Sequence, residues 1–183
     1  YGMTLLEDKN INIPGWNKVD FLLKKYPNIK LLNGIDGKGD LYNEKNLQYM
    51  IDNFSNSMDI ITGDGGFDFS ADFNKQESTA FRLIFTQVIY ALIMQKKNGH
   101  FVLKIFDIFE DCTIDILYLL NTFYEKVIVM KPYTSRYANS EKYIICKHFK
   151  YDNISDLHTK FIGILKFFNG FDFDKYTIHS ILD

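Results

Sequence analysis

The chain has 183 residues, of which 46% are hydrophobic and 24% are charged, and its formal net charge is −2. This composition predicts one domain with a real core; it excludes a disordered chain and a strongly basic one, so a nucleic-acid partner would need a local basic patch. The two cysteines, Cys112 and Cys146, show neither metal-ligand spacing nor a disulfide framework, which favours a reducing compartment, and no apolar run reaches the about 18 residues of a membrane helix.

Strands and helices alternate along the predicted chain. In chain order we expect weak strands at residues 1–5 and 28–32, a strand at 58–62, a helix at 76–97, a strand at 100–105, a helix from about 113 to 123, strands at 126–130 and 143–146, and a helix at 157–168. Asn98-Gly99 is expected to stop the first helix, and Thr113 to cap the second. This alternation predicts one α/β domain over residues 1–183, with a mainly parallel sheet covered by helices on both faces.

The last two predicted strands are expected to pair antiparallel at a sheet edge. The link between them, residues 131–141, is shorter than the about a dozen residues that a parallel crossover needs. An antiparallel strand begins at the edge where parallel strands end. Asp64 follows one parallel strand, Lys104 ends another and Glu141 begins the antiparallel one, so we expect the three side chains to meet.

Taken alone, each of these three residues has an ordinary explanation. Asp64 stands before two glycines and is typical of a turn, Lys104 is typical of a solvated strand end, and Glu141 of a surface acid. Their joint placement is what indicates a site, because two acids and an amine at one edge could activate a weakly acidic hydroxyl. The histidines show no metal-ligand spacing, so the sequence predicts no metal site.

Several segments carry a family resemblance, which covers roughly residues 1–150. They are Gly-Met-Thr-Leu at 2–5, Gly-Ile-Asp-Gly-Lys-Gly-Asp at 34–40, Asp-Gly-Gly-Phe at 64–67, Gly-His-Phe-Val-Leu-Lys at 99–104, and the block running from Thr-Ser-Arg at 134–136 to Glu-Lys-Tyr at 141–143 and Cys-Lys at 146–147. With these segments the chain resembles the FtsJ-like ribose 2'-O-methyltransferases, and within them the cap-specific mRNA (nucleoside-2'-O-)methyltransferases.

The resemblance implies a cofactor, a substrate and a set of site residues. The cofactor is S-adenosyl-L-methionine, and the partners are capped mRNA and other capping enzymes, with no membrane. Catalysis falls to Asp64, Lys104 and Glu141, with Lys104 as the base. The residues implied in cofactor binding are Gly39, Asp40, Asp64 and Gly65. Those implied in substrate binding are Arg136, Asn139 and Ser140, with Lys131 beside RNA phosphates and Phe69 and Phe73 stacking on a base or packing in the core.

The chain also departs from the family pattern. The family's first catalytic lysine, which Glu141 would hold, and its glycine-rich cofactor loop both lie upstream of the residues present. We therefore expect a Rossmann-like S-adenosylmethionine-dependent methyltransferase sheet with an antiparallel edge strand, lacking the first strand and helix, in a truncated chain that is poorly stable and inactive alone. Tyr137 stands where the family more often has proline.

Two other functions compete with methylation of capped mRNA. The first keeps the chemistry and changes the substrate to ribosomal or transfer RNA. The second is a non-catalytic RNA-binding remnant of the fold. The retained Asp64, Lys104 and Glu141 argue against the remnant, whereas the absent cofactor loop argues for it. The sequence leaves a nuclear or a cytoplasmic location open.

Overall fold

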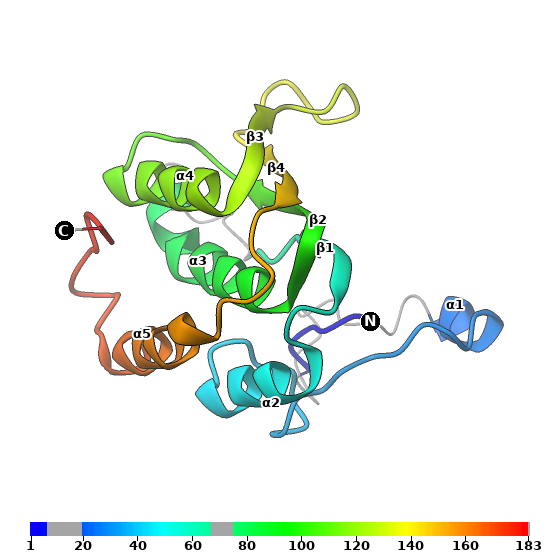
Figure 1. Ribbon diagram of the computed structural model, residues 1–183. Helices are drawn as coiled ribbons and strands as arrows, with labels where there is room; N and C mark the ends of the chain where they lie inside the picture. The colour runs from blue at the N-terminus through cyan, green and yellow to red at the C-terminus, as the bar shows by residue number, and fades with distance from the viewer. Residues whose placement is uncertain (7–19, 67–74, 183) are drawn as a thin grey trace.

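The computed structural model describes residues 1–6, 20–66 and 75–182 (Figure 1). The elements in chain order are α1 (Asp20–Lys25), α2 (Glu44–Phe54), β1 (Met58–Gly63), α3 (Gln76–Met94), β2 (Gln95–Ile105), α4 (Asp111–Phe123), β3 (Tyr124–Met130), β4 (Lys142–Phe149), the short 3-10 helix η3 (Ser155–Leu157) and α5 (His158–Gly170). No helix in these ranges is long and apolar enough to cross a membrane.

The four strands form one mixed sheet in the order β1-β2-β4-β3. β1 and β2 are parallel, while β4 runs antiparallel to both β2 and β3. The predicted antiparallel pairing of the last two strands is confirmed. The expectation that the antiparallel strand forms the sheet edge is wrong: β3 occupies the edge, and the short return from residue 131 to 141 inserts β4 between β3 and β2.

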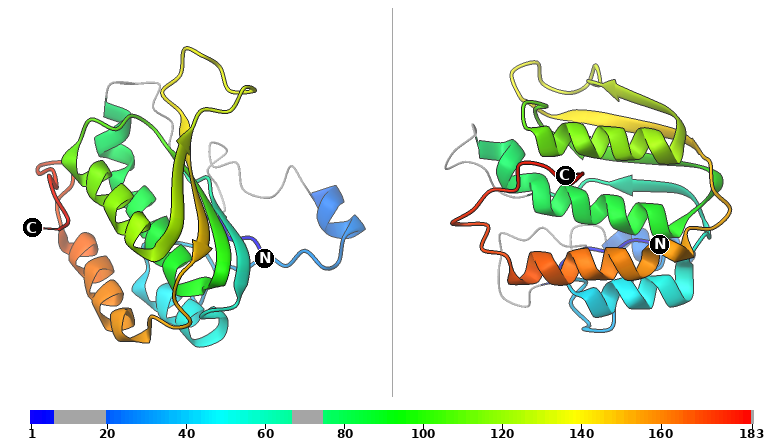
Figure 2. Two further views of the ribbon diagram at one scale, coloured as in Figure 1. Left: turned by 45° about the horizontal axis from the view of Figure 1, so that its top comes forward. Right: turned by 60° about the vertical axis from the view of Figure 1, so that its left-hand side comes forward.

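In the described part of the chain, helices cover one face of the sheet. Figure 2 shows α3, α4 and α5 on the same side of the strands. Along β2 the side chains of Phe101, Leu103 and Ile105 are buried toward these helices, while Val102 and Lys104 on the other face are only partly covered. The expectation of helices on both faces is therefore not met by the residues that the structure describes. The unbroken apolar runs in β3 and β4 predicted helices on both faces of the sheet. In the structure, the residues of these strands that face away from the helices are half-buried or exposed.

The boundary between α3 and β2 differs from its prediction. The helix ends at Met94, and β2 begins at Gln95 without a loop. Asn98, at φ +65°, and Gly99 lie inside β2, where the register with β1 shifts. They do not stop the helix. The buried side chain of Gln95 donates to the carbonyl oxygens of Met58 (2.8 Å) and Asp59 (3.3 Å) and accepts from the Tyr124 hydroxyl (3.0 Å), so it ties together the starts of three strands.

The N-terminus of α4 is held by a residue distant in sequence. Thr113 lies within the helix and does not cap it; the N-cap position is Glu110, whose side chain makes no capping bond. Instead the buried carboxylate of Glu77 accepts the backbone N–H of Phe109 (3.0 Å) and of Glu110 (3.0 Å). A carboxylate at this position satisfies free N–H groups and complements the positive end of the helix.

Replacing Glu77 with glutamine is expected to lower the free energy of unfolding by about 1–3 kcal/mol. The neutral amide of glutamine is a weaker acceptor than the carboxylate and can turn its NH2 group toward the backbone, so one backbone N–H loses its anionic acceptor. Urea unfolding at neutral pH measures the loss. Glu125→Gln, at an exposed position in β3, serves as the matched control. An equal, small change in both variants would contradict a capping role for Glu77.

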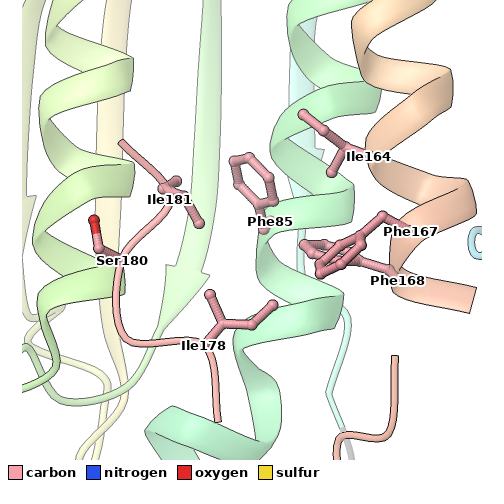
Figure 3. A pocket seen from close by; sticks show the side chains of 7 residues that line it. All are labelled: Phe85, Ile164, Phe167, Phe168, Ile178, Ser180 and Ile181. Atoms are coloured by element: carbon pink, nitrogen blue, oxygen red, sulfur yellow. The ribbon is translucent and has the colours of Figure 1, made fainter. Parts of the chain in front are cut away.

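The N-terminal residues and the C-terminal tail complete the packing. The weak strand candidates are reduced to one parallel bridge between Gly2 and Leu31, and α2 was not predicted. The tail is tied to α4 by Asp115, which accepts from Ser180 Oγ (2.6 Å) and Ile181 N (2.8 Å); these bonds hold the pKa of Asp115 below its ordinary value. A mostly apolar pocket of about 190 Å³ lies between the tail, α3 and α5. Figure 3 shows the side chains that line it.

Candidate active site

Asp64 and Lys104 form an ion pair where the neighbouring parallel strands β1 and β2 end. Lys104 Nζ lies 2.7 Å from Asp64 Oδ1 and donates to the Asp64 carbonyl oxygen at 3.1 Å. The Lys104 side chain is 15% exposed, whereas the Asp64 side chain is 72% exposed. The Lys104 amine is thus held in place by two acceptors of Asp64, while the Asp64 carboxylate stays open to solvent.

Glu141 reaches the same edge through Tyr143. Tyr143 of β4 is the cross-strand partner of Lys104, and its hydroxyl donates to Glu141 Oε1 at 3.2 Å. Burial and the negative charges of Glu141 and Asp64 raise the pKa of Tyr143, which keeps its hydroxyl protonated as a donor. Both carboxylates therefore act on one group beside Lys104. The structure brings Asp64 into contact with Lys104, while Glu141 is hydrogen-bonded to Tyr143, the cross-strand neighbour of Lys104. The catalytic roles of all three residues stay predictions.

The turn that carries Asp64 is fixed from below by Gln87. This buried side chain of α3 accepts the Gly65 N–H through Oε1 at 2.8 Å, while its Nε2 donates to the Leu83 carbonyl at 3.2 Å. A Cβ atom on Gly63 or Gly65 would come within 3.0 Å of Gln87 Oε1, so glycine lets the turn rest directly on the helix. Sequence reasoning missed Gln87. A polar residue in the middle of an apolar helix was the available signal.

The β3–β4 loop, residues 131–141, contains the residues predicted to contact RNA. Lys131 Nζ donates to Asn139 O (2.8 Å), Asn139 Oδ1 (2.6 Å) and Glu141 O (2.9 Å). The Ser140 hydroxyl donates to Gln76 of α3. Lys131, Asn139 and Ser140 are thus engaged within the protein, while Arg136 is exposed. Substrate binding by Arg136, Asn139 and Ser140 stays a prediction.

The predicted cofactor loop, residues 34–40, is organised around Asp36 and Asn46. Asn46 Oδ1 accepts from the N–H of Ile35 (2.7 Å), and its Nδ2 donates to the Asp40 carbonyl (2.8 Å). Burial raises the pKa of Asp36, but hydrogen bonds from Lys38 N–H, from asparagine side chains and from Gly39 N–H outweigh it and lower the pKa overall. No sequence pattern predicted the role of Asn46, whose side chain is fully buried.

The structure does not join this loop to the acidic and basic side chains above. Within the described ranges, no hydrogen bond or ion pair links Gly39 or Asp40 to Asp64, Lys104 or Glu141. One carboxylate oxygen of Asp40 accepts from Tyr42 N at 2.8 Å. Phe69 and Phe73 lie outside the described residues. Among the residues that are described, no cluster of metal-ligating side chains occurs.

Comparison with known proteins places these residues in a family. Residues 1–149 match the sequence model of a protein family that is described as "FtsJ-like methyltransferase". The chain is 35% identical over 122 residues to cap-specific mRNA (nucleoside-2'-O-)-methyltransferase 2 of Drosophila melanogaster, covering 64% of this chain and 17% of that protein. It is 37% identical over 122 residues to cap-specific mRNA (nucleoside-2'-O-)-methyltransferase 1 of Bos taurus, covering 64% of this chain and 15% of that protein.

Two further matches show the extent of the similarity. The Xenopus laevis methyltransferase 1 is 32% identical over 136 residues, which are 72% of this chain and 16% of the relative. The chain therefore spans about one sixth of the length of these relatives. A crystal structure of a ribosomal RNA methyltransferase from Plasmodium falciparum superposes with a TM-score of 0.46 at 15% identity, over 71% of this chain and 79% of that one.

Proposed function

The chain belongs to the FtsJ-like methyltransferase family, and on that premise we propose that it methylates the ribose 2'-oxygen of capped mRNA near the 5' end, with S-adenosyl-L-methionine as the methyl donor. The observation that carries the proposal is the Lys104–Asp64 ion pair beside Glu141 and Tyr143. The cap-specific relatives support the choice of RNA. The four strands then belong to a Rossmann-like methyltransferase sheet.

Lys104 is the proposed base. The Lys104 ammonium, which is ion-paired with Asp64 in the structure, must first lose a proton to solvent; the neutral amine then has two N–H groups and one lone pair. Asp64 Oδ1 and the Asp64 carbonyl oxygen are both within hydrogen-bond distance of Lys104 Nζ, so they can accept the two N–H groups and leave the lone pair for the ribose hydroxyl proton. Removing this proton as the oxygen attacks makes the 2'-oxygen a competent nucleophile. Much of the remaining rate comes from holding the two reactants in line.

Asp64 and Glu141 are the proposed orienting groups. Asp64 fixes Lys104 and presents its open carboxylate to the reacting pair, and Glu141 with Tyr143 supplies hydrogen-bonding groups on the opposite side of Lys104. S-adenosyl-L-methionine, when bound, would supply a methyl group on a positively charged sulfur, so that the leaving group would be neutral. Gly39, Asp40, Asp64 and Gly65 are the residues proposed to hold it, since carboxylates accept from the amino and hydroxyl groups of a nucleoside.

The test is transfer of labelled methyl from S-adenosyl-L-methionine to RNA by the natural-length protein that contains these residues. Capped mRNA leader, the same leader without a cap, ribosomal RNA and transfer RNA are compared. Label on a ribose 2'-oxygen of the capped RNA alone supports the proposal. Preference for ribosomal or transfer RNA moves the substrate to the alternative class. Binding of RNA without transfer to any of them points to the non-catalytic remnant.

Replacing Gln87 with methionine is expected to lower turnover about tenfold with a smaller change in KM for RNA, because the Gly65 N–H loses its acceptor and Asp64 is no longer held against Lys104. Steady-state kinetics at saturating cofactor measure both constants. Thr86→Val is the matched control: Thr86 is the buried neighbour on α3, and its hydroxyl has no hydrogen-bond partner among the residues that the structure describes. Loss of stability in Gln87→Met with unchanged turnover would assign Gln87 a structural role alone.

A further inference from the structure

Two tyrosines of the β3–β4 loop present their rings to solvent beside the candidate active site. Tyr133 is 97% exposed and Tyr137 is 90% exposed. Figure 1 shows the loop projecting beyond the ends of β3 and β4. We propose that Tyr133 and Tyr137 form a stacking surface for the bases of single-stranded RNA next to the methylated nucleotide. The inference rests on the proposed function and adds a substrate-binding element to the same site.

The loop is held in shape by its own hydrogen bonds. Lys131 at its start donates to the backbone of Asn139 and Glu141 at its end, which closes the loop at its base. Inside the loop, Ser135 N donates to the Pro132 carbonyl at 3.0 Å. A surface that keeps its shape before binding loses less conformational entropy when RNA arrives, so exposed rings on this loop are better placed to bind than rings on an unsupported one.

The side chains of the loop divide into an inner and an outer set. The inner polar groups, Lys131, Asn139 and Ser140, are engaged with the protein. The outer groups are the two rings and the exposed side chain of Arg136, which has no hydrogen bond or ion pair to any residue that the structure describes; its backbone carbonyl accepts from Asn139 N at 3.3 Å. In the sequence Arg136 lies between the two tyrosines, and this set of side chains suits a nucleic acid, because a guanidinium can pair with a phosphate while rings take the bases.

The position of the loop fits an RNA strand that enters the site. The loop ends at Glu141, whose carboxylate is held by Tyr143, the cross-strand partner of Lys104. A ribose that reaches Lys104 therefore leaves its neighbouring nucleotides close to the loop. A single exposed tyrosine is ordinary on a protein surface. Two rings flanking an exposed arginine on a closed loop at the site match the way proteins hold single-stranded RNA by stacking.

The test uses a short capped RNA with 2-aminopurine at the nucleotide after the methylated one, because stacking on an aromatic ring quenches this base. The natural-length protein is expected to bind the RNA and quench its fluorescence. Tyr133→Ala and Tyr137→Ala are each expected to weaken binding about tenfold, and the double variant to abolish the quenching. The double phenylalanine variant, which keeps both rings, is expected to bind as the unchanged protein does.

The controls make failure of the inference distinct from failure of the proposed function. Tyr118→Ala removes an exposed tyrosine from α4, away from the loop, and is expected to leave binding and quenching unchanged. Methyl transfer to capped RNA is measured in parallel. If the double alanine variant binds, quenches and methylates with unchanged KM, the stacking inference is overturned while the methyltransferase stands. If no variant methylates but the rings still govern quenching, the inference holds and the proposed function fails.

A third result would also overturn the inference. Should the double alanine variant keep its RNA affinity but change the oligomeric state measured by sedimentation, the two rings are a contact between copies of the protein. A salt series completes the experiment. Replacing Arg136 with glutamine is expected to lower the slope of log affinity against log salt by about one phosphate contact, whereas the tyrosine variants leave the slope unchanged.

Discussion

Replacing Lys104 with methionine is expected to reduce methyl transfer by about 100-fold or more while leaving the protein folded. The reduction follows from the loss of a positioned general base, which contributes about 10²–10⁴-fold. Methionine is an unbranched apolar side chain of similar length, and the backbone pairing of residue 104 with Tyr143 does not depend on the side chain. Asp64 loses its partner, but its carboxylate is open enough for water to solvate it.

Two further variants separate the possible causes of that loss. Lys96→Met removes another lysine of β2 that is also paired with an aspartate, Asp59 at 3.0 Å, at the opposite end of the strand. It is expected to retain full activity. Lys104→Arg keeps the positive charge but cannot act as a base near neutral pH, so it is expected to be as inactive as the methionine variant. Activity restored by arginine would show that charge alone is needed and would remove the base from the mechanism.

Replacing Gly39 with alanine is expected to lower the free energy of unfolding by about 3 kcal/mol or more, a loss of the size that forced backbone rearrangements cause. Gly39 has φ +69°, and a Cβ atom there would lie 2.1 Å from the carbonyl oxygen of Thr4. That oxygen belongs to the backbone, so it can move only with the whole segment. The segment is held next to Gly39 by the bond from Leu6 N to the Lys38 carbonyl at 2.7 Å.

Gly37 provides a matched control for this prediction. It has nearly the same backbone angle, φ +70°, but a Cβ atom there meets no atom of the described residues within 4 Å. Gly37→Ala is therefore expected to cost only the about 1–2 kcal/mol of a left-handed alanine. Urea unfolding compares the two, and calorimetric titration with S-adenosyl-L-methionine shows whether the same substitution at Gly39 weakens cofactor binding. Equal losses at both positions would contradict the close approach to Thr4.

The edge of the sheet that carries Asp64, Lys104 and Glu141 could be predicted from sequence because each residue follows or precedes a short apolar run. The link at residues 131–141 is too short for a parallel crossover, so the strand after it must run antiparallel and begin where the parallel strands end. This placed Glu141 at the same edge. Tyr143 was visible in the same block, but its contact with Glu141 depends on cross-strand register. Register is set by tertiary pairing and cannot be extracted from local spacing.

Other features escaped prediction for physical reasons. Asn98-Gly99 is a strong turn signal, yet here it accommodates an irregularity inside a strand. The helix ends earlier, at Met94, before the polar residues Gln95, Lys96 and Lys97, which are good helix formers and give no stop signal. The cap of α4 comes from Glu77, on a different helix, so no local pattern could contain it. The support beneath the site, Gln87, is a single polar side chain whose meaning appears only when the Gly65 turn is packed on it.

The insertion of β4 between β2 and β3 also governs when the site can form. In the sheet that the structure describes, β3 has no backbone partner except β4, although β3 is made first. As the chain leaves the ribosome, β1 and β2 can pair early, so Asp64 and Lys104 can meet while β3 is still unpaired. Glu141 and Tyr143 join them only when the strand that closes the sheet has been synthesised. Completion of the sheet and completion of the candidate active site therefore coincide in one late step of folding, driven by contacts between residues far apart in the chain.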